Sequence, residues 1–262
     1  MDLQLRDRVV LITGGSKGIG AACAEAFAAE GARVAIASRD AAHLAAARER
    51  LRAAGHEVFT HAADLRDAAA AEALVAATEA ALGPVDVLVN SAGAAQRTPY
   101  AELTAAHWAA AMQAKFFTTV HAMQALLPRM AARGRGSVVN IVGAGGKLAS
   151  AHHLPGGSAN AALMLASAGL AHAYGRQGVR VNAVNPGLVA TGRLHEGLVA
   201  QARASGESPE ALLERQRAAL PQGRICEPAE VARVVLFLAS PAASYVSGAV
   251  LTVDGALTPM VV

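Results

Sequence analysis

The chain has 262 residues and a formal net charge of +3, and 53% of its residues are hydrophobic while 3% are aromatic. Its basic residues are scattered rather than gathered in a tract, which argues against a nucleic-acid partner. No apolar run reaches the roughly 18 to 20 residues that a membrane-spanning helix needs. The polar beginning predicts no signal peptide, and two distant cysteines predict reduced thiols in a cytoplasmic protein without a metal site.

Short β-branched runs alternate along the chain with alanine-rich segments of helical periodicity. This alternation predicts right-handed βαβ units, and therefore a single α/β domain over residues 1–262 with a doubly wound, mostly parallel sheet between helices. The segment 188–226 is the one irregular insertion and is predicted to form a helical flap before the last helix. The predicted strands are 8–12, 33–37, 57–61, 86–90, 136–142, 179–184 and 249–253.

A glycine-rich stretch, TGGSKGIG at 13–20, follows the first predicted strand and opens a helix. Gly14, Gly18 and Gly20 allow a tight turn and a close approach of the backbone to a pyrophosphate, which the free N–H groups of the helix would bind. An ordinary glycine turn is the alternative, but the strand–loop–helix context favours dinucleotide binding.

The end of the second predicted strand indicates which dinucleotide is preferred. Sites for NAD(H) usually place a carboxylate there, whereas this chain has Ser38 followed by Arg39, with Lys17 available from the glycine loop. A small hydroxyl with two cations suits a 2′-phosphate, so NADP(H) is favoured over NAD(H). The alternative is that Arg39 is a surface residue at a helix start.

Two further strand ends carry polar signals. Asp64 follows the third predicted strand, where it is expected to accept a hydrogen bond from the adenine amino group, to cap the next helix, or to do both. The sequence NSAG at 90–93 ends the fourth strand and is expected beside the cofactor.

Together with NPG at 185–187 and the ending GRICEPAEV…LTVDGA over 223–256, these motifs resemble the short-chain dehydrogenase/reductase family. The similarity is to its single-domain classical type, related to β-ketoacyl carrier-protein reductases, and the motifs span nearly the whole chain in the family's order. The resemblance implies a Rossmann fold, NAD(P)(H), a small-molecule substrate and an assembly that is usually a homotetramer, with a homodimer as the alternative. The residues expected to contact the cofactor are Gly14, Ser16, Lys17, Gly18, Ile19, Gly20, Ser38, Arg39, Asp64, Leu65, Asn90, Ala92, Gly93, Pro186, Gly187 and Val189.

The catalytic groups of the family are absent. Its members use a Tyr to protonate the substrate oxygen, a Lys that lowers the pKa of the phenol, a Ser that binds the same oxygen and an Asn on the preceding helix. Aligned on AAL at 161–163 and on NPG, those positions hold Gly156, Asn160, Gly143 and Lys115 respectively. None of the four residues matches.

Three residues remain as candidates for the chemistry. Lys and Asn have exchanged places, so the Lys115 ammonium is expected near the nicotinamide ribose, opposite Asn160; the alternative is that Lys115 reaches solvent or pairs elsewhere. His153, next to His152 on the loop before Gly156, is a candidate general acid, with a solvated loop as its alternative. The glycines also predict room for a bulky ligand.

Three functions follow from this sequence. The first is an atypical NADP(H)-dependent oxidoreductase acting on a carbonyl, imine or alkene. The second is a catalytically silent subunit, paired with an active paralogue through the helical regions around 101–130 and 156–176. The third is a non-redox dehydratase or cyclase. Retained cofactor motifs favour the first, the missing tetrad favours the second, and the sequence does not identify a substrate.

Overall fold

The computed structural model describes residues 2–93, 98–151 and 153–259. The predicted α/β fold is confirmed: seven parallel strands form one sheet in the order β3-β2-β1-β4-β5-β6-β7. The predicted strands are all present, and the largest difference is that β6 continues to Pro186. The strands are β1 (Val9–Thr13), β2 (Arg33–Ser38), β3 (Val58–Ala62), β4 (Val87–Asn90), β5 (Gly136–Ile141), β6 (Val179–Pro186) and β7 (Val250–Val253).

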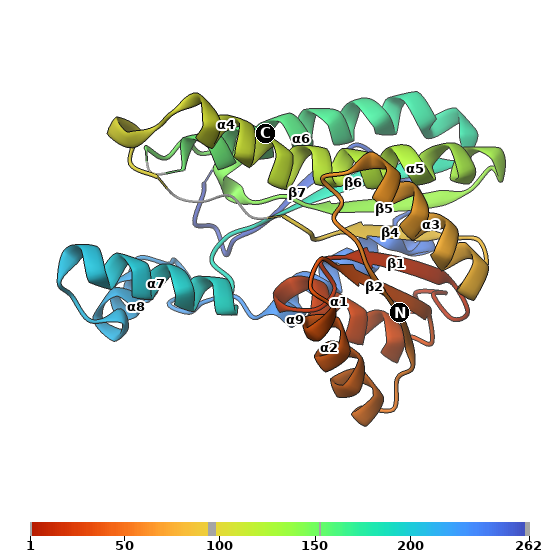
Figure 1. Ribbon diagram of the computed structural model, residues 1–262, viewed down its shortest axis with the longest axis horizontal. Coiled ribbons are helices and arrows are strands. Elements are labelled where there is room, and N and C mark those ends of the chain that lie inside the picture. The colour runs from red at the N-terminus through yellow and green to blue at the C-terminus, as the bar shows by residue number, and fades with distance from the viewer. Residues whose placement is uncertain (1, 94–97, 152, 260–262) are drawn as a thin grey trace.

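Helices cover both faces of the sheet (Figure 1). Successive strand residues point to opposite faces, and here both sets are apolar. Val10 and Ile12 pack with α1, α2 and α9, whereas Val9 and Leu11 pack with α3 and α5. Both faces are apolar, as expected for a parallel sheet between helical layers. These helices are α1 (Gly18–Ala29), α2 (Ala41–Ala53), α3 (Ala68–Leu82), α4 (Ala105–Ala111), α5 (Thr118–Ala132), α6 (Leu154–Tyr174) and α9 (Pro228–Ala239).

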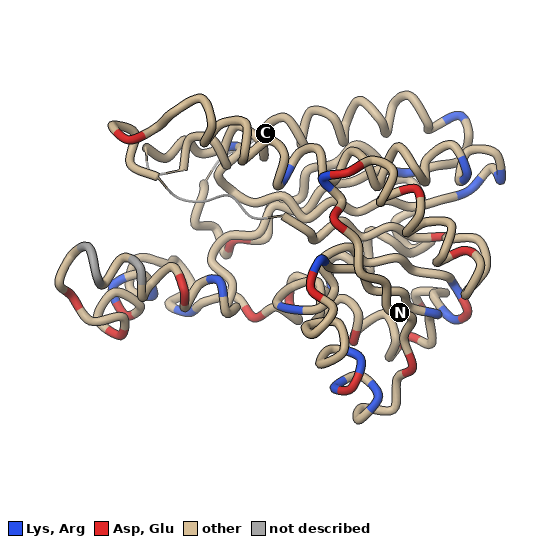
Figure 2. Tube along the Cα trace, viewed as in Figure 1, with Lys and Arg blue, Asp and Glu red and all other residues tan. Residues whose placement is uncertain are grey.

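The insertion predicted as a helical flap contains two helices, α7 (Gly192–Ser205) and α8 (Pro209–Ala218). They project to one side of the sheet and its layers (Figure 1). Leu198 and Leu212 are buried there, so the insertion has a small apolar core of its own. Basic and acidic residues are interspersed along the outer helices, without a tract of one sign (Figure 2).

From β1 the chain first builds the sheet in one direction, through β2 and β3. It then continues on the other side of β1, where β4 pairs with β1. In doubly wound sheets a ligand binds outside the carboxyl ends of the strands at this switch point. The loops that leave β1 and β4 there carry Gly14 and Gly93. A π-helix, Met112–Phe117, separates α4 from α5 and brings Lys115 to the same edge; such helices are frequent at functional sites.

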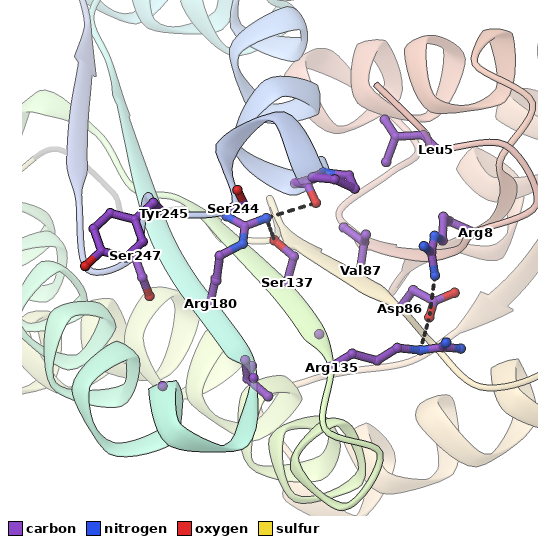
Figure 3. A pocket seen from close by; sticks show the side chains of 16 residues that line it. Leu5, Arg8, Asp86, Val87, Arg135, Ser137, Arg180, Ser244, Tyr245 and Ser247 are labelled. Atoms are coloured by element: carbon purple, nitrogen blue, oxygen red, sulfur yellow. Dashed lines mark hydrogen bonds and ion pairs between the residues drawn. The ribbon is translucent and has the colours of Figure 1, made fainter. Parts of the chain in front are cut away.

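The opposite edge of the sheet has a groove of about 580 Å³, in which Arg180 is the central polar side chain (Figure 3). Its guanidinium donates to the carbonyl oxygens of Leu238, Ala239 and Ser240 at 2.8 to 3.2 Å, and so caps the last turn of α9. Nearby, Asp86 pairs with Arg8 and Arg135. These contacts join separate segments of the chain, so we assign the residues of this groove a role in the stability of the fold.

Candidate active site

Two glycines of the glycine loop, Gly14 and Gly20, are packed too tightly to accept side chains. A Cβ atom on Gly14 would lie 2.7 Å from the backbone nitrogen of Ala92, and one on Gly20 would lie 2.2 Å from the carbonyl oxygen of Gly14. Gly14 also has a φ of +68°, which L side chains rarely adopt. The loops after β1 and β4 therefore touch through backbone atoms, leaving a cradle lined by peptide groups.

Two helix N-termini meet at this cradle. Helix α1 follows Lys17 and helix α7 follows Thr191, and neither residue gives a side-chain hydrogen bond to its helix. Their proximity is shown at Gly18, where a Cβ would lie 3.3 Å from the Thr191 methyl group. Free N–H groups and the positive ends of two helix dipoles make the cradle suitable for a pyrophosphate.

The end of β2 gathers the groups predicted to select a 2′-phosphate. Lys17 Nζ lies 2.8 Å from His43 Nε2 on α2, which places the ammonium beside this strand end. Ser38 Oγ donates to the carbonyl oxygen of Asp40 at 3.1 Å, and Arg39 between them is exposed. Asp40 caps α2 by accepting from the backbone N–H of His43. A hydroxyl and two cations therefore stand at one corner.

Asp64 is engaged by a neighbour that the sequence analysis did not single out. Both carboxylate oxygens accept from Arg66 Nε at 3.0 Å, and this ion pair holds the pKa of Asp64 at about 2. The alternative in which Asp64 caps the next helix is wrong, because Asp67 caps α3 by accepting from the backbone N–H of Ala69. Adenine recognition by Asp64 remains a prediction and would require Arg66 to share that carboxylate.

Asn90 lies in a buried chain of polar side chains rather than on the surface of the cradle. Its amide nitrogen donates to Asn140 Oδ1 at 2.9 Å, and its oxygen accepts from Thr13 Oγ1 at 3.2 Å. Asn140 Nδ2 donates onward to Ser167 Oγ on α6 at 2.9 Å. The chain joins β1, β4, β5 and α6, and thereby fixes the loops that leave those strands.

The remaining predicted cofactor residues line the carboxyl edge or support it. Gly187 follows β6, where a Cβ would lie 2.8 Å from the Cβ of Asp254. Val189 pairs in an isolated bridge with Cys226, which fixes the base of the flap. Leu65 is a core residue whose carbonyl oxygen lies 2.9 Å from His121 Nδ1. Ser16 is buried, whereas Ile19, Ala92, and Gly93 are partly exposed and Pro186 is buried.

The positions aligned with the family's Ser and Lys are bonded to each other. Asn160 Nδ2 donates to the carbonyl oxygen of Gly143 at 3.3 Å, and the Gly143 N–H donates to Asn185 Oδ1 at 3.0 Å. Asn160 is 2% exposed. Its Oδ1 is buried and has no hydrogen-bond partner among residues 2–93, 98–151 and 153–259. The site therefore contains a buried acceptor that lacks a donor.

The glycines after β5 serve close packing. The 3₁₀ turn Ala144–Gly146 lies on the beginning of α6, where a Cβ on Gly157 would be 2.6 Å from the carbonyl oxygen of Gly145. A Cβ on Gly146 would be 2.7 Å from the Met164 methyl group, and one on Gly143 would be 3.1 Å from Asn160 Nδ2. Neighbouring atoms therefore occupy the space at Gly146 and Gly157 and approach Gly143 closely, whereas room for a bulky ligand at Gly156, aligned with the family's Tyr, stays a prediction.

Lys115 lies at the cradle, partly buried in the π-helix. A Cβ on Gly93 would be 3.5 Å from both Cα and Cγ of Lys115. Burial, and secondarily the charge of Arg193, lowers the pKa of Lys115 to about 8. The chain has only two other lysines, Lys17 and Lys147. The alternative that Lys115 forms an ion pair elsewhere finds no partner in the described part of the chain.

Of the two histidines on the loop before α6, the structure describes His153. His153 precedes α6, and its ring lies against the 3₁₀ turn, 3.0 Å from where a Gly145 Cβ would be. Its carbonyl oxygen accepts from the N–H of Gly157 at 2.8 Å. His152 lies outside the described residues. The same Gly145 Cβ position is 3.8 Å from Asn160 Nδ2, so His153 and Asn160 both lie against this turn, and the role of His153 as a general acid stays a prediction.

The residues present fit a nicotinamide dinucleotide. The cradle has no room for a Cβ at Gly14 or Gly20, two helix N-termini without side-chain caps face it, and the buried Asn160 oxygen is an acceptor with which a ribose hydroxyl is chemically compatible. The residues that would hold the group are those of the glycine loop, the end of β2 and the loop after β4. The sequence analysis did not predict Arg193, which α7 of the flap places beside Gly93, because no motif marks this residue.

Comparison with known proteins agrees with this geometry. A family model described as enoyl-(acyl carrier protein) reductase matches residues 14–258. Galactitol 2-dehydrogenase (L-tagatose-forming) of Cereibacter sphaeroides is 39% identical over 249 residues, which cover 94% of this chain and 93% of that protein. No described helix of the present chain is long and apolar enough to cross a membrane.

Two solved structures extend the comparison to complexes. L-Sorbose reductase of Gluconobacter frateurii, complexed with NADPH and L-sorbose, matches with a TM-score of 0.93 at 29% identity, covering 100% of both chains. A variant of actinorhodin polyketide ketoreductase with NADPH matches with a TM-score of 0.91 at 34% identity, covering 97% of this chain and 98% of that one. The protein therefore belongs to the short-chain dehydrogenase/reductase family of oxidoreductases.

Proposed function

We propose that the protein is an NADP(H)-dependent reductase in which Lys115 takes over proton donation from the family's tyrosine. The observation that carries this proposal is the position of Lys115, partly buried against Gly93 with a pKa near 8. A general acid works best when its pKa is close to the working pH. At neutral pH the ammonium is largely protonated, yet it gives up a proton more readily than an ordinary lysine.

When bound, NADPH supplies a hydride to the substrate. Lys115 then has two tasks at the substrate oxygen or nitrogen: its positive charge stabilises the negative charge that develops, and its N–H gives the proton. Asn160 orients the nearby ribose or substrate hydroxyl through its free acceptor. A carbonyl, an imine or an activated alkene each requires one hydride and one proton, so all three suit these residues.

The preference for NADPH is supported by the corner at the end of β2. Ser38, Arg39 and Lys17 stand where a carboxylate would be needed to select the free ribose hydroxyl. Calorimetric titration with NADPH and NADH tests this part of the proposal. We expect NADPH to bind more tightly, and we would abandon the reductase assignment if neither nucleotide bound.

Turnover tests the role of Lys115. NADPH oxidation is followed spectroscopically with a panel of carbonyl, imine and activated alkene substrates. Replacing Lys115 by Met should lower kcat by about 10²- to 10³-fold, because one acid group is lost. The matched variant Lys147→Met should leave kcat unchanged. Product formation without NADPH oxidation would instead indicate a non-redox enzyme.

A catalytically silent subunit is the second candidate, favoured by the replacement of the family's four catalytic residues, and the exposed face of α6 offers a surface for its assembly. Ser158, Ala161, Leu165 and Gly169 follow one another on that face, and Leu165 is 77% exposed. Small residues around a large apolar one suit close helix–helix packing between subunits. We propose assembly through this face, with a second copy or with an active relative.

A further inference from the structure

Lys115 and Arg193 approach the same backbone segment from two different elements. Arg193, in the first turn of α7, donates from Nη2 to the carbonyl oxygen of Gly93 at 2.8 Å. Lys115 lies against the α-carbon of the same glycine, within 3.5 Å of its Cβ position. Arg193 is exposed and Lys115 is partly buried. The arginine is thus the more exposed and the lysine the more buried of the two cations.

The described part of the chain offers Lys115 and Arg193 no ion-paired acid. The four residues that follow Gly93 in the sequence are Ala, Ala, Gln and Arg, so they supply no carboxylate either. Like charges brought together away from bulk water disfavour the charged state, and the charge of Arg193 lowers the pKa of Lys115 in addition to burial.

The other described contacts of Gly93 are with uncharged groups. The backbone of Ala114 packs here as well, because a Cβ on Gly93 would lie 3.2 Å from the Ala114 carbonyl oxygen. An oxyanion between the two cations would remove their repulsion and satisfy both as hydrogen-bond donors. Arg presents a planar fork that matches a carboxylate or a phosphate, while Lys adds a compact charge.

We propose that Lys115 and Arg193 together bind an oxyanion beside Gly93, and that this oxyanion is the carboxylate of the substrate. The inference rests on the proposed function, because it places the acid group next to the reacting carbon. It defines the substrate class as an acid whose reducible C=O or C=N group lies close to its carboxylate, as in a 2-oxo acid. The dinucleotide carries oxyanions too, so its phosphates are the competing source.

Amine labelling separates these sources, because the chain has only three lysines and each can be followed by mass spectrometry. The labelling midpoint of Lys115 is measured for the protein alone, with NADPH, with oxalate and with phenylpyruvate. A bound carboxylate should move the midpoint upward by about one pH unit or more, while Lys17 and Lys147 serve as internal references. The same shift with NADPH alone would assign the oxyanion to the cofactor and overturn the substrate assignment.

Variants test the part played by Arg193. Arg193→Met should weaken phenylpyruvate binding, measured by calorimetry, by about tenfold or more and abolish the labelling shift. Arg193→Lys keeps the charge but not the fork and should lose less. Arg176→Met, another exposed arginine, is the control. Thermal midpoints show whether each variant is folded.

The outcomes are distinguishable from failure of the proposed function. If Arg193→Met lowers phenylpyruvate affinity but keeps NADPH affinity, the carboxylate site is supported. If NADPH binds and neither oxalate nor phenylpyruvate shifts Lys115, the carboxylate site is overturned while the reductase proposal stands. If NADPH does not bind but the carboxylates still shift Lys115, the proposed function fails and the oxyanion site remains.

Discussion

Asn160 donates its amide hydrogen to the carbonyl oxygen of Gly143, so two positions that carry catalytic groups elsewhere in the family are here bonded to each other. The contact is close enough that a Cβ on Gly143 would lie 3.1 Å from the Asn160 nitrogen. Gly143 also has a φ of +132°, a conformation that side chains rarely adopt. The replacements at these two positions therefore depend on one another.

This dependence predicts that a single restored serine will not bring back the family's site. Gly143→Ser should lower the free energy of unfolding by about 1 to 3 kcal/mol, from backbone strain and the contact with Asn160. Urea unfolding measures the change. The control is Gly169→Ser, on the exposed face of α6 with open space around it. Equal stability of the two serine variants would contradict the packing described here.

Cofactor selectivity should depend on the corner at the end of β2. Arg39→Ala should weaken NADPH binding about tenfold or more and leave NADH binding almost unchanged, because only the 2′-phosphate is lost as a partner. Calorimetric titration of both nucleotides measures the ratio. Arg48→Ala, on the exposed surface of α2, is the matched control. A parallel loss for both nucleotides would mean that Arg39 does not read the 2′-phosphate.

The charge on Lys115 should lower the free energy of unfolding at neutral pH. The folded protein lowers its pKa to about 8 from the ordinary value of 10.5, so an unpaired charge is held in a partly buried place below pH 8. Lys115→Met should therefore raise the free energy of unfolding by about 1 kcal/mol at pH 7. This gain should shrink as pH rises from 8 to 10.5, since the folded state then loses its proton before the unfolded state does.

Denaturant unfolding at pH 7 and at pH 9.5 gives that comparison directly. Lys147→Met serves as the control and should show no such trend. The opposite result would be a Lys115→Met substitution that lowers the free energy of unfolding at pH 7 and lowers it less at pH 9.5. It would show that Lys115 has a counter-charge in the folded protein.

The fold could be predicted because its signals are local. Alternating β-branched runs and alanine-rich segments specify the strands and helices, and the glycines at 14 and 20 specify a cradle that the backbone distances now explain. The site was less predictable because its decisive contacts join distant residues. Arg66, which binds Asp64, is close to it in the sequence. Arg193 donates to the carbonyl oxygen of Gly93 from 100 residues further along the chain, and no spacing rule relates these two residues.

The amino edge of the sheet should be sensitive to Arg180. Its guanidinium binds carbonyl oxygens at the end of α9 and also Ser137 Oγ at 3.2 Å. Arg180→Met would leave several of these acceptors without donors, and we expect a loss of about 2 to 4 kcal/mol in urea unfolding. Arg176→Met is the exposed control. A loss near zero would mean that water replaces the guanidinium.

Assembly should depend on the exposed face of α6. Leu165→Glu places a charge in the middle of the stripe that contains Ala161 and Gly169, where a partner helix would have to desolvate it. Light scattering coupled to size-exclusion chromatography should show a smaller species for this variant than for the natural chain. Arg48→Glu, on the opposite side of the sheet, should leave the assembly unchanged. A monomeric natural chain, or an unaltered oligomer in Leu165→Glu, would exclude this face as the subunit interface.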